Sequence, residues 1–450
     1  MPKKKTALTI EERLQQALVP AEEQPYEVPE NWVWVRLGAI AEIVTGGTPS
    51  KKHPEYYGGN FPFYKPSDLD QGRLTYDASE YLSEEGKKVS RIIPKNSTAV
   101  CCIGSIGKCG YLMCEGTTNQ QINSAIPKIN SLCLYYYLCT ENFVQNLLSM
   151  ASATTIAIVN KSKMESCAFP LPPLSEQQRI VERIEELFAK LDEAKERLQE
   201  VADSFAVRKA AILHKAFTGE LTKQWRRENG VSDESWEEKK LGEICKIGSG
   251  GTPSRKHAEY YNGNIPWIKT GELAWNVITE AEEYITEEAV LNSSAKMHCA
   301  GSVLVAMYGQ GLTRGKAAIL GINATTNQAV CSLKPLELLM SEFLFYYFMK
   351  NYWQFREEAV GGNQPNYSAK MISSWIISLP TLPEQHEIVR LIDDLLARER
   401  AAQQATEQAL ASIDLMKKSI LARAFRGELG TNKASEASAL ELLKQVLAED

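Results

Sequence analysis

Two short segments of the chain combine cations with aromatic residues directly after a glycine-rich turn. The first follows the Gly-Gly-Thr-Pro sequence at residues 46–49, and the second follows the same four residues at 250–253. Such a turn allows close approach to a phosphate backbone, where lysine or arginine would neutralise charge. A solvated turn whose tyrosines cover the core would have the same sequence. The candidate phosphate contacts are Lys51, Lys52 and His53 in the first segment and Arg255, Lys256 and His257 in the second.

A second polar group is a Thr-Asn-Gln triplet that occurs twice. Asparagine and glutamine can bond bidentately to an adenine edge, and threonine can contact a thymine methyl group or a phosphate. A structural turn shared by two copies of one unit would equally contain these residues, so both interpretations stay open. The triplets are Thr118, Asn119 and Gln120, and Thr326, Asn327 and Gln328.

A third group lies where two otherwise similar segments differ. Segments that vary between copies are candidates for contacting different base sequences, and arginine and asparagine have suitable donors for base edges. For each of them, an ordinary solvated loop residue is the alternative. The candidates are Lys65, Ser67 and Lys108 in the first half, and Lys269, Thr270, Arg314, Lys316, Asn363, Gln364 and Asn366 in the second.

The chain contains no sequence signature of a catalytic site. An Asn-Pro-Pro-Tyr tetrad, a His-Glu-x-x-His motif and a nucleophile elbow are missing from the sequence. Residues 311–317 imitate a phosphate loop, but the glycines lie one residue too close and Ala317 replaces the metal-binding Ser or Thr. The ten cysteines include no Cys-x-x-Cys pair and are not repeated across the chain. We expect a non-catalytic chain with reduced thiols and with no metal or cofactor of its own.

The elements that carry these residues form a tandem duplication. Residues 37–69 and 241–273 are identical at 19 of 33 positions with a constant offset of 204. A four-residue insertion near residues 309–311 then changes the offset to 208. Short apolar runs at 97–103 and 302–307 predict buried strands, and the segments 132–150 and 337–352 predict helices. Each copy is therefore expected to contain a globular α+β domain.

A long helix is predicted after each globular domain. Apolar or small residues recur in steps of four and three from residue 180 to 205, which is typical of a coiled-coil seam. Ser175 and Gln178 form a capping box at the expected start, and Glu399 interrupts the second seam. The seam residues are Ile180, Ile184, Leu187, Leu191, Ala194, Leu198, Val201 and Phe205, and then Ile388, Ile392, Leu395, Ala402, Thr406, Ala409 and Ile413.

The predicted fold class is α+β, with two tandem α+β domains joined by two long antiparallel coiled-coil helices in pseudo-twofold symmetry. Pairing of each helix with another subunit is the alternative to pairing within the chain. The predicted boundaries are 1–26 for an N-terminal arm, 27–170 and 236–378 for the globular domains, and 171–235 and 379–450 for the helical regions. Short amphipathic helices are expected after Thr9, which forms a capping box with Glu12, and at 438–447.

The charge of the chain limits how it could bind nucleic acid. Fifty Lys and Arg residues stand against 56 Asp and Glu residues, for a net charge of −6. A protein that grips nucleic acid alone is usually basic. Any basic surface is therefore expected to be confined to part of the chain. Tight binding to nucleic acid is expected to need a partner protein as well. The sequence has neither a signal peptide nor a long apolar segment, which predicts a cytoplasmic protein.

Taken in order, these features resemble the specificity subunit of type I restriction-modification systems. The resemblance rests on the opening motif at 28–40, the repeated glycine turns with 260–267, and two pairs of segments that bound the helices. The pair at the helix starts is LPPLSEQ and LPTLPEQ, at 171–177 and 379–385, and the pair at the helix ends is AFTGEL and AFRGEL, at 216–221 and 424–429. The likeness spans nearly the whole chain.

The resemblance implies two target recognition domains, each reading one half of a split site in double-stranded DNA. It implies that the paired helices set the gap between half-sites, and that the chain acts in phage defence. It also implies two methyltransferase subunits that use S-adenosylmethionine, and two restriction subunits that need ATP and Mg²⁺. The 41 residues from 175 to 215 would span roughly 60 Å as a helix. The short terminal helices are expected to pack near each other and to complete the pseudo-twofold arrangement or dock a methyltransferase.

A function of a different class is compatible with the same sequence. A non-catalytic coiled-coil scaffold could use the duplicated domains to bind protein or glycan, for which exposed aromatic pairs are suited. This alternative predicts no salt-sensitive binding to DNA, whereas phosphate contacts are strongly salt-dependent. The missing nuclease and methyltransferase motifs argue against a self-contained restriction enzyme.

Overall fold

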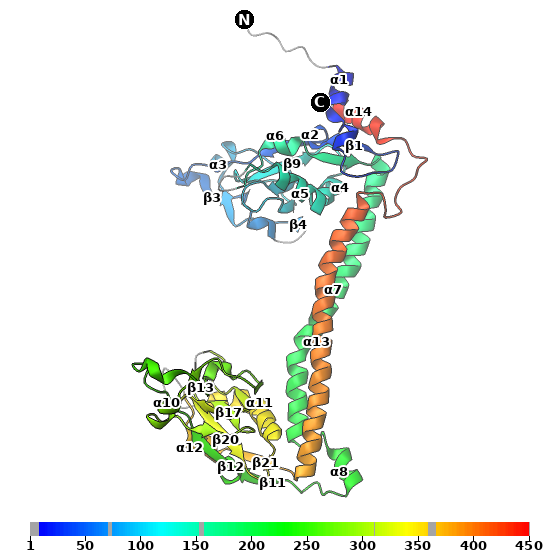
Figure 1. Ribbon diagram of the computed structural model, residues 1–450. Helices are drawn as coiled ribbons and strands as arrows, with labels where there is room; N and C mark the ends of the chain where they lie inside the picture. Colours follow the sequence, from blue (N-terminus) through cyan, green and yellow to red (C-terminus); the bar gives the residue numbers. More distant parts are fainter. Residues whose placement is uncertain (1–8, 71–73, 153–156, 310, 359–365, 450) are drawn as a thin grey trace. The chain divides into compact units, whose positions relative to one another are not determined.

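A computed structural model describes residues 9–70, 74–152, 157–309, 311–358 and 366–449 (Figure 1). The chain divides into two compact units. Unit 1 contains residues 1–198 with 408–450, and unit 2 contains residues 199–407. Each unit therefore holds one copy of the repeated sequence together with one half of each long helix.

The globular α+β domain of unit 1 begins and ends with two strands that pair with each other. β1 (Val33–Arg36) and β10 (Ala168–Leu171) pair antiparallel and close the domain. A five-stranded sheet has the order β2-β9-β6-β7-β4, and a three-stranded sheet has the order β5-β3-β8. The strands of these two sheets are β2 (Ala41–Thr45), β3 (Tyr57–Tyr64), β4 (Leu74–Thr75), β5 (Glu80–Leu82), β6 (Thr98–Cys101), β7 (Cys109–Leu112), β8 (Thr117–Thr118) and β9 (Ile122–Pro127). The helices are α2 (Leu37–Ile40), α3 (Glu84–Lys88), α4 (Ser131–Leu138), α5 (Glu141–Met150) and α6 (Lys161–Glu165), with 3₁₀ turns η1 (Ala21–Glu23), η2 (Pro54–Tyr56) and η3 (Asp68–Asp70).

Unit 2 repeats this topology with two differences: its smaller sheet has a fourth strand, and one continuous helix replaces α4 and α5. β11 (Glu237–Lys240) pairs with β21 (Ile376–Leu379), and the sheets have the orders β12-β20-β17-β18-β14 and β15-β13-β19-β16. The strands of these two sheets are β12 (Cys245–Ser249), β13 (Tyr261–Ile268), β14 (Val277–Ile278), β15 (Tyr284–Ile285), β16 (Met297–His298), β17 (Val303–Ala306), β18 (Ala317–Leu320), β19 (Ala324–Thr326) and β20 (Val330–Pro335). The helices are α8 (Lys223–Asn229), α9 (Leu241–Ile244), α10 (Glu287–Leu291), α11 (Ser341–Glu358) and α12 (Ala369–Ser374), with η4 (Ala258–Tyr260) and η5 (Thr270–Glu272). The predicted duplication and α+β fold class are thereby confirmed.

The short apolar runs form the centres of both larger sheets. All four residues of β6 are buried, and so are all four residues of β17. The helix predicted over 132–150 is interrupted, because the Thr140 hydroxyl accepts a hydrogen bond from the Phe143 N–H at 3.3 Å and starts α5 as a new helix. A side-chain cap of this kind satisfies an N–H that the first helical turn leaves without a partner.

Two long helices, α7 (Leu174–Phe217) and α13 (Leu382–Ala424), run antiparallel within the chain (Figure 1). In unit 1 Lys195 pairs with Asp414 at 3.4 Å, and in unit 2 Arg208 pairs with Glu399 at 2.9 Å. The residue number falls on α13 as it rises on α7, which is the antiparallel order. The prediction of intramolecular pairing is confirmed.

The capping box expected at Ser175 is not formed. The N–H groups of Glu176 and Gln177 donate to the Pro173 carbonyl at 2.9 and 3.0 Å, so α7 already begins at Leu174. Ser175 therefore lies inside the first turn rather than before it. The physical reason is that a backbone carbonyl of the proline-rich segment accepts the first helical bonds.

The predicted seam residues fall into three environments. Ile180 and Ile184 join the core of unit 1, Ile388 and Ile392 join the core of unit 2, and Phe205, Thr406 and Ile413 are also buried. Leu187, Leu191, Leu198, Leu395 and Ala409 are half-buried. Ala194, Val201 and Ala402 are exposed, Val201 by 40%, which does not fit a buried seam. Small side chains at these layers leave little apolar surface to bury, and the Arg208–Glu399 ion pair occupies the neighbouring layer.

A buried glutamate ties the start of each long helix to the segment that follows the other. In unit 1 the Glu176 carboxylate accepts hydrogen bonds from the Trp32 indole at 2.7 Å, from Asn432 at 2.9 Å and from Thr431 at 3.3 Å. In unit 2 Glu384 accepts from Thr222 and from the Arg226 guanidinium, both at 2.7 Å. Both glutamates are fully buried. We call these two groups the carboxylate clamps.

The short terminal helices pack against one another in unit 1, as predicted. α1 (Ile10–Ala17) begins with the expected capping box, in which Glu12 N–H donates to Thr9 and Thr9 N–H donates to Glu12. Ala17 shares one core with Leu443 and Leu447 of α14 (Ala439–Glu449). Burial here joins the two ends of the described chain to one domain.

All ten cysteines carry free thiols. Burial raises the pKa of Cys102 and Cys331 to about 12, so these thiols stay protonated at neutral pH. The thiolate is the reactive form of cysteine. Their role in both copies is therefore packing.

Replacing Glu176 by alanine tests the clamp in unit 1. Two buried donors and one half-buried donor would lose their acceptor, so we expect Glu176→Ala to lower the free energy of unfolding by about 2–4 kcal/mol. Glu182→Ala, at an exposed position of the same helix, is the matched control and should change stability by less than about 0.5 kcal/mol. Urea denaturation followed by circular dichroism measures both. Equal midpoints for the two variants would contradict the role of the clamp.

Candidate nucleic-acid interface

The two basic turns have the same internal geometry. In unit 1 the Tyr57 hydroxyl donates to the Pro49 carbonyl at 2.5 Å, and in unit 2 Tyr261 donates to Pro253 at 2.6 Å. The first glycine of each Gly-Gly-Thr-Pro sequence approaches the Thr-Asn segment so closely that a Cβ atom would meet backbone oxygens at 2.1–2.4 Å. A glycine-rich sequence is required there by this contact. Each turn is thus anchored at its base, with its basic residues exposed at the tip.

The histidines of both turns are engaged within their own turn. The His53 ring stacks on Tyr56 with ring centroids 5.0 Å apart, and its Nδ1 lies 2.8 Å from Glu55. His257 repeats this arrangement at 4.9 Å from Tyr260 and 2.8 Å from Glu259. Bonds from the glutamate's own backbone N–H and from the histidine lower the pKa of both glutamates. The histidines therefore shape the turn, a role that sequence alone did not separate from phosphate contact.

The cations at the tips differ between the copies. Arg255 donates to both carboxylate oxygens of Glu283 at 2.5 and 3.0 Å, and its guanidinium lies 4.2 Å from the Tyr261 ring centroid. Lys51 occupies the corresponding position in unit 1. Among the described residues Lys51, Lys52 and Lys256 form no ion pair and are exposed. These three lysines are the cations most open to a phosphate.

The lysines at the ends of β3 and β13 are already paired. Lys65 lies 2.5 Å from Glu80, and Lys269 lies 3.2 Å from Glu282 and 3.7 Å from Glu283. Ser67 is exposed and Thr270 is half-buried beside them. The carboxylates hold both ammonium groups close to the small sheet. A phosphate would have to share them with these carboxylates.

The repeated Thr-Asn-Gln triplets are mainly structural. Thr118 and Thr326 are fully buried and lie on strands β8 and β19, which pair with β3 and β13. The Asn119 and Asn327 side chains accept hydrogen bonds from the backbone two residues on, at 3.0 and 3.1 Å. The prediction of base contact does not fit these buried threonines, because the strand pairing removes them from the surface. The exposed members of the triplets are Gln120, which accepts a hydrogen bond from Thr48, and Gln328.

The loop that contains the insertion in unit 2 is fixed to α11. The Arg356 guanidinium donates to the carbonyls of Arg314 at 2.6 Å and Gly311 at 2.9 Å, and the Tyr352 hydroxyl donates to Leu312 at 2.5 Å. Arg314 donates back to the Arg356 carbonyl at 3.3 Å. Lys316 and its counterpart Lys108 are half-buried where this loop enters the central sheet. The structure thus brings Arg314 and Lys316 together with α11.

Two candidates for base contact, Asn363 and Gln364, lie outside the described residues. Asn366 is described and exposed. Among the described residues no three His, Cys, Asp or Glu side chains gather as a metal site. None of the described helices combines the length and apolar composition that a membrane span requires.

The repeated domains with these turns match one family model. The type I restriction modification DNA specificity domain covers residues 29–203 and 233–410. The chain belongs to this family.

Specificity subunits of other organisms are similar over most of their length. The MjaIX specificity subunit of Methanocaldococcus jannaschii is 25% identical over 345 residues, covering 72% of this chain and 77% of that protein. The EcoKI specificity subunit of Escherichia coli K12 is 24% identical over 458 residues, covering 94% and 96%. The crystal structure of the HsdS subunit from Thermoanaerobacter tengcongensis has a TM-score of 0.63 at 19% identity, covering 90% of this chain and 99% of that chain. This last similarity concerns the fold.

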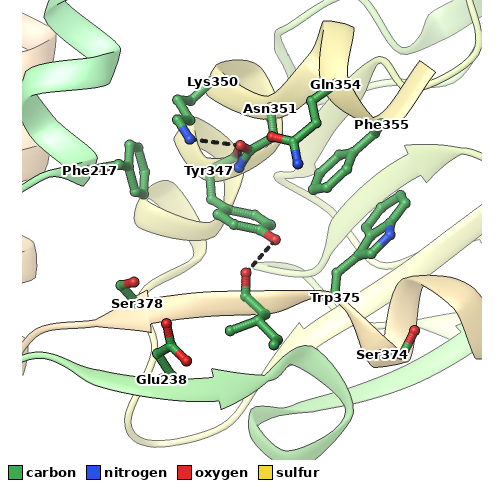
Figure 2. Close-up of a pocket in the computed structure, with 11 residues that line it drawn as sticks. Phe217, Glu238, Tyr347, Lys350, Asn351, Gln354, Phe355, Ser374, Trp375 and Ser378 are labelled. Carbon is green, nitrogen blue, oxygen red and sulfur yellow. Dashed lines mark hydrogen bonds between the residues drawn. The ribbon is translucent and has the colours of Figure 1, made fainter. Parts of the chain in front are cut away.

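One surface of this specificity subunit was not expected from the sequence. In unit 2 a cavity of about 470 Å³ lies between the end of α7, α11 and the β11–β21 pair (Figure 2). Tyr347 crosses it and donates to the Ile376 carbonyl at 2.8 Å. In unit 1 the corresponding face is covered by the N-terminal arm, where the Tyr26 ring lies 4.9 Å from Trp34. The covering residues come from the segment just before β1: Tyr26 lies eight residues before Trp34, and Gly230 stands at the corresponding position before β11.

The exposed lysines of the first turn are open to a direct test. Affinity for DNA falls as salt rises, and each lysine that contacts a phosphate adds about 0.9 to the steepness of log affinity against log salt. Removing such a lysine makes the dependence shallower by this amount. We therefore expect Lys51→Gln with Lys52→Gln to lower the slope by about 1.8 for cognate and unrelated duplexes alike. Fluorescence anisotropy at several salt concentrations measures this.

Lys87→Gln serves as the control in the same domain, because Lys87 already pairs with Glu115 at 3.0 Å. Its slope should equal that of the unaltered chain. A loss of affinity confined to one base sequence would show that the turn reads bases rather than phosphates.

Proposed function

We propose that the chain reads a split DNA site, with one half-site bound by the globular domain of each unit. The observation that carries this proposal is that the same framework of turn and sheets occurs twice with different surface residues. Arg255 is paired with Glu283 whereas Lys51, at the corresponding position, is exposed, and the loop bearing Arg314 is longer in the second copy. A shared framework with differing loops suits two half-sites of different sequence.

In this proposal α7 and α13 act as the spacer between the half-sites. Ion pairs across the two helices hold their register in both units. Helices of more than 40 residues are about 60 Å long. A helical turn of duplex DNA is about 34–36 Å. A rigid spacer of this length suits half-sites about one to two turns apart.

The chain itself is proposed to be non-catalytic. Two methyltransferase subunits would bind it and methylate adenine with S-adenosylmethionine, and two restriction subunits would add ATP- and Mg²⁺-dependent translocation and cleavage. The acidic net charge of −6 supports a shared grip, because a partner would then supply much of the positive surface around the duplex. The chain would act with these partners in the cytoplasm.

Mapping adenine methylation tests this function. A methylation-free host would express the chain with its cognate methyltransferase, next to a control that lacks the chain. We expect long-read sequencing to show methylation at a split motif with a fixed gap, and only in the presence of the chain. Absence of methylation despite an intact purified complex would contradict the proposal and favour a scaffold.

Shortening both helices tests the spacer separately. Removing residues 196–202 and 406–412 deletes one heptad from each helix and preserves the antiparallel register, because these segments face one another. Seven residues correspond to about 10 Å of helix, or about three base pairs at 3.4 Å per step. We expect the same two half-sites with a gap shorter by about this amount, if the shortened subunit still supports methylation. An unchanged gap in active complexes would contradict the spacer role.

A further inference from the structure

A second cavity in unit 2 lies between α7 and α11. Its volume is about 500 Å³, and it is lined by the cations Lys209 and Lys350, by His214, and by the aromatic rings of Trp275, Tyr352 and Trp353. None of the described residues that line it is acidic. Trp353 is 64% exposed and forms an open flat wall. We call this feature the cationic groove.

The two copies differ in charge at this position of the helices. Lys209 on α7 corresponds to Lys417 on α13, and in unit 1 the Lys417 ammonium binds the Asp192 carboxylate. The residue that corresponds to Asp192 in unit 2 is Arg400. Burial first and the nearby Arg400 charge second lower the pKa of Lys209. Unit 2 thus replaces an ion pair by two cations of like charge.

Like charges at one site destabilise a protein unless an anion neutralises them. Lys350 is the second cation that lines the groove, beside Lys209, and its ammonium donates to the neutral Asn351 side chain at 2.9 Å (Figure 2). Among the described residues Lys209 and Arg400 form no ion pair. The groove is therefore positively charged and open to solvent, and none of the described side chains that line it is an anion. These are the properties of a site for an external anion.

The cationic groove continues along α11 to the candidate DNA-reading loop. Arg356 lies six residues after Lys350, about 9 Å along the helix axis, and it bonds the carbonyls of Arg314 and Gly311. Its guanidinium also lies 5.3 Å from the Tyr352 ring centroid, and Tyr352 lines the groove. Phosphates of one DNA strand recur every 3.4 Å along the duplex axis. One stretch of backbone can therefore meet both ends of this surface.

We infer that the cationic groove binds the phosphate backbone of duplex DNA beside the half-site read by unit 2. This inference rests on the proposed function and adds a sequence-independent contact at the spacer, made in unit 2 and absent from the matching position in unit 1. Lys209, Arg400 and Lys350 supply the charge. The exposed face of Trp353 packs against the sugars. No acidic side chain has to be displaced for the DNA to bind.

Two variants test the groove in the complex of full chain and methyltransferase. Arg400→Asp gives unit 2 the charge arrangement of unit 1, and Lys350→Gln removes a cation from the opposite wall. We expect each to lower the slope of log affinity against log salt by about 1 to 2, with cognate and unrelated duplexes affected equally. The methylated motif should stay the same. Unfolding midpoints check that both variants remain folded.

Arg197→Asp is the matched control on the spacer. Arg197 is exposed on α7 in unit 1 and already pairs with Glu193 at 2.5 Å. Its salt slope should equal that of the unaltered chain. Groove variants that match this control would overturn the inference. Loss of methyltransferase assembly with an unchanged slope would also overturn it and point to an acidic segment of the partner protein. A complex that methylates no split motif even without substitutions would instead contradict the proposed function.

Discussion

A buried carboxylate lies in the first turn of each long helix, and its hydrogen bonds fix how the two helices pack against the segments around them. Glu176 binds the chain just before β1 and the segment just after α13. Glu384 binds the segment just after α7. The start of one helix is thereby fixed to the end of the other at both ends of the pair. Sliding of the antiparallel helices by one turn would break both clamps and leave buried charges unpaired, which is costly. The clamps therefore set the register of the two helices.

The clamps use different chemistry for the same purpose. Glu176 is held by three neutral donors, whereas Glu384 is held by a hydroxyl and by Arg226, which also binds Asp233 at 3.0 Å. A buried carboxylate needs compensation by hydrogen bonds or by an opposite charge. Each copy meets this need mainly with residues that follow the other long helix, to which unit 1 adds Trp32 from the segment before β1. The framework can thus tolerate divergence of the segments around an invariant acceptor.

The sequence allowed the duplication, the α+β class and both long helices to be predicted, because repeated identity and a 3.5-residue period are strong signals. It could not predict which basic residues are free. Arg255 and Lys51 look alike in their turns, but Glu283 neutralises only the first, from 28 residues away in the chain. Likewise the Thr-Asn-Gln triplet looks polar, yet strand pairing buries Thr118 and Thr326. The exposed layer at Val201 depends on the partner helix, which a local pattern does not reveal.

The packing of α1 against α14 has a topological consequence. Ala17 and Leu447 share one core, so the first and last helices of the described chain pack together in unit 1. In the order of its elements the chain is then a topological ring of two repeated halves, because its last helix packs against its first. The chain is open between α14 and α1, and the connection between α8 and β11 is the equivalent place in the other half. A ring of this kind can be opened at either connection without cutting through an element, so a circular permutation joining residue 449 to residue 9 would keep the capping box of α1 and the cores of both domains.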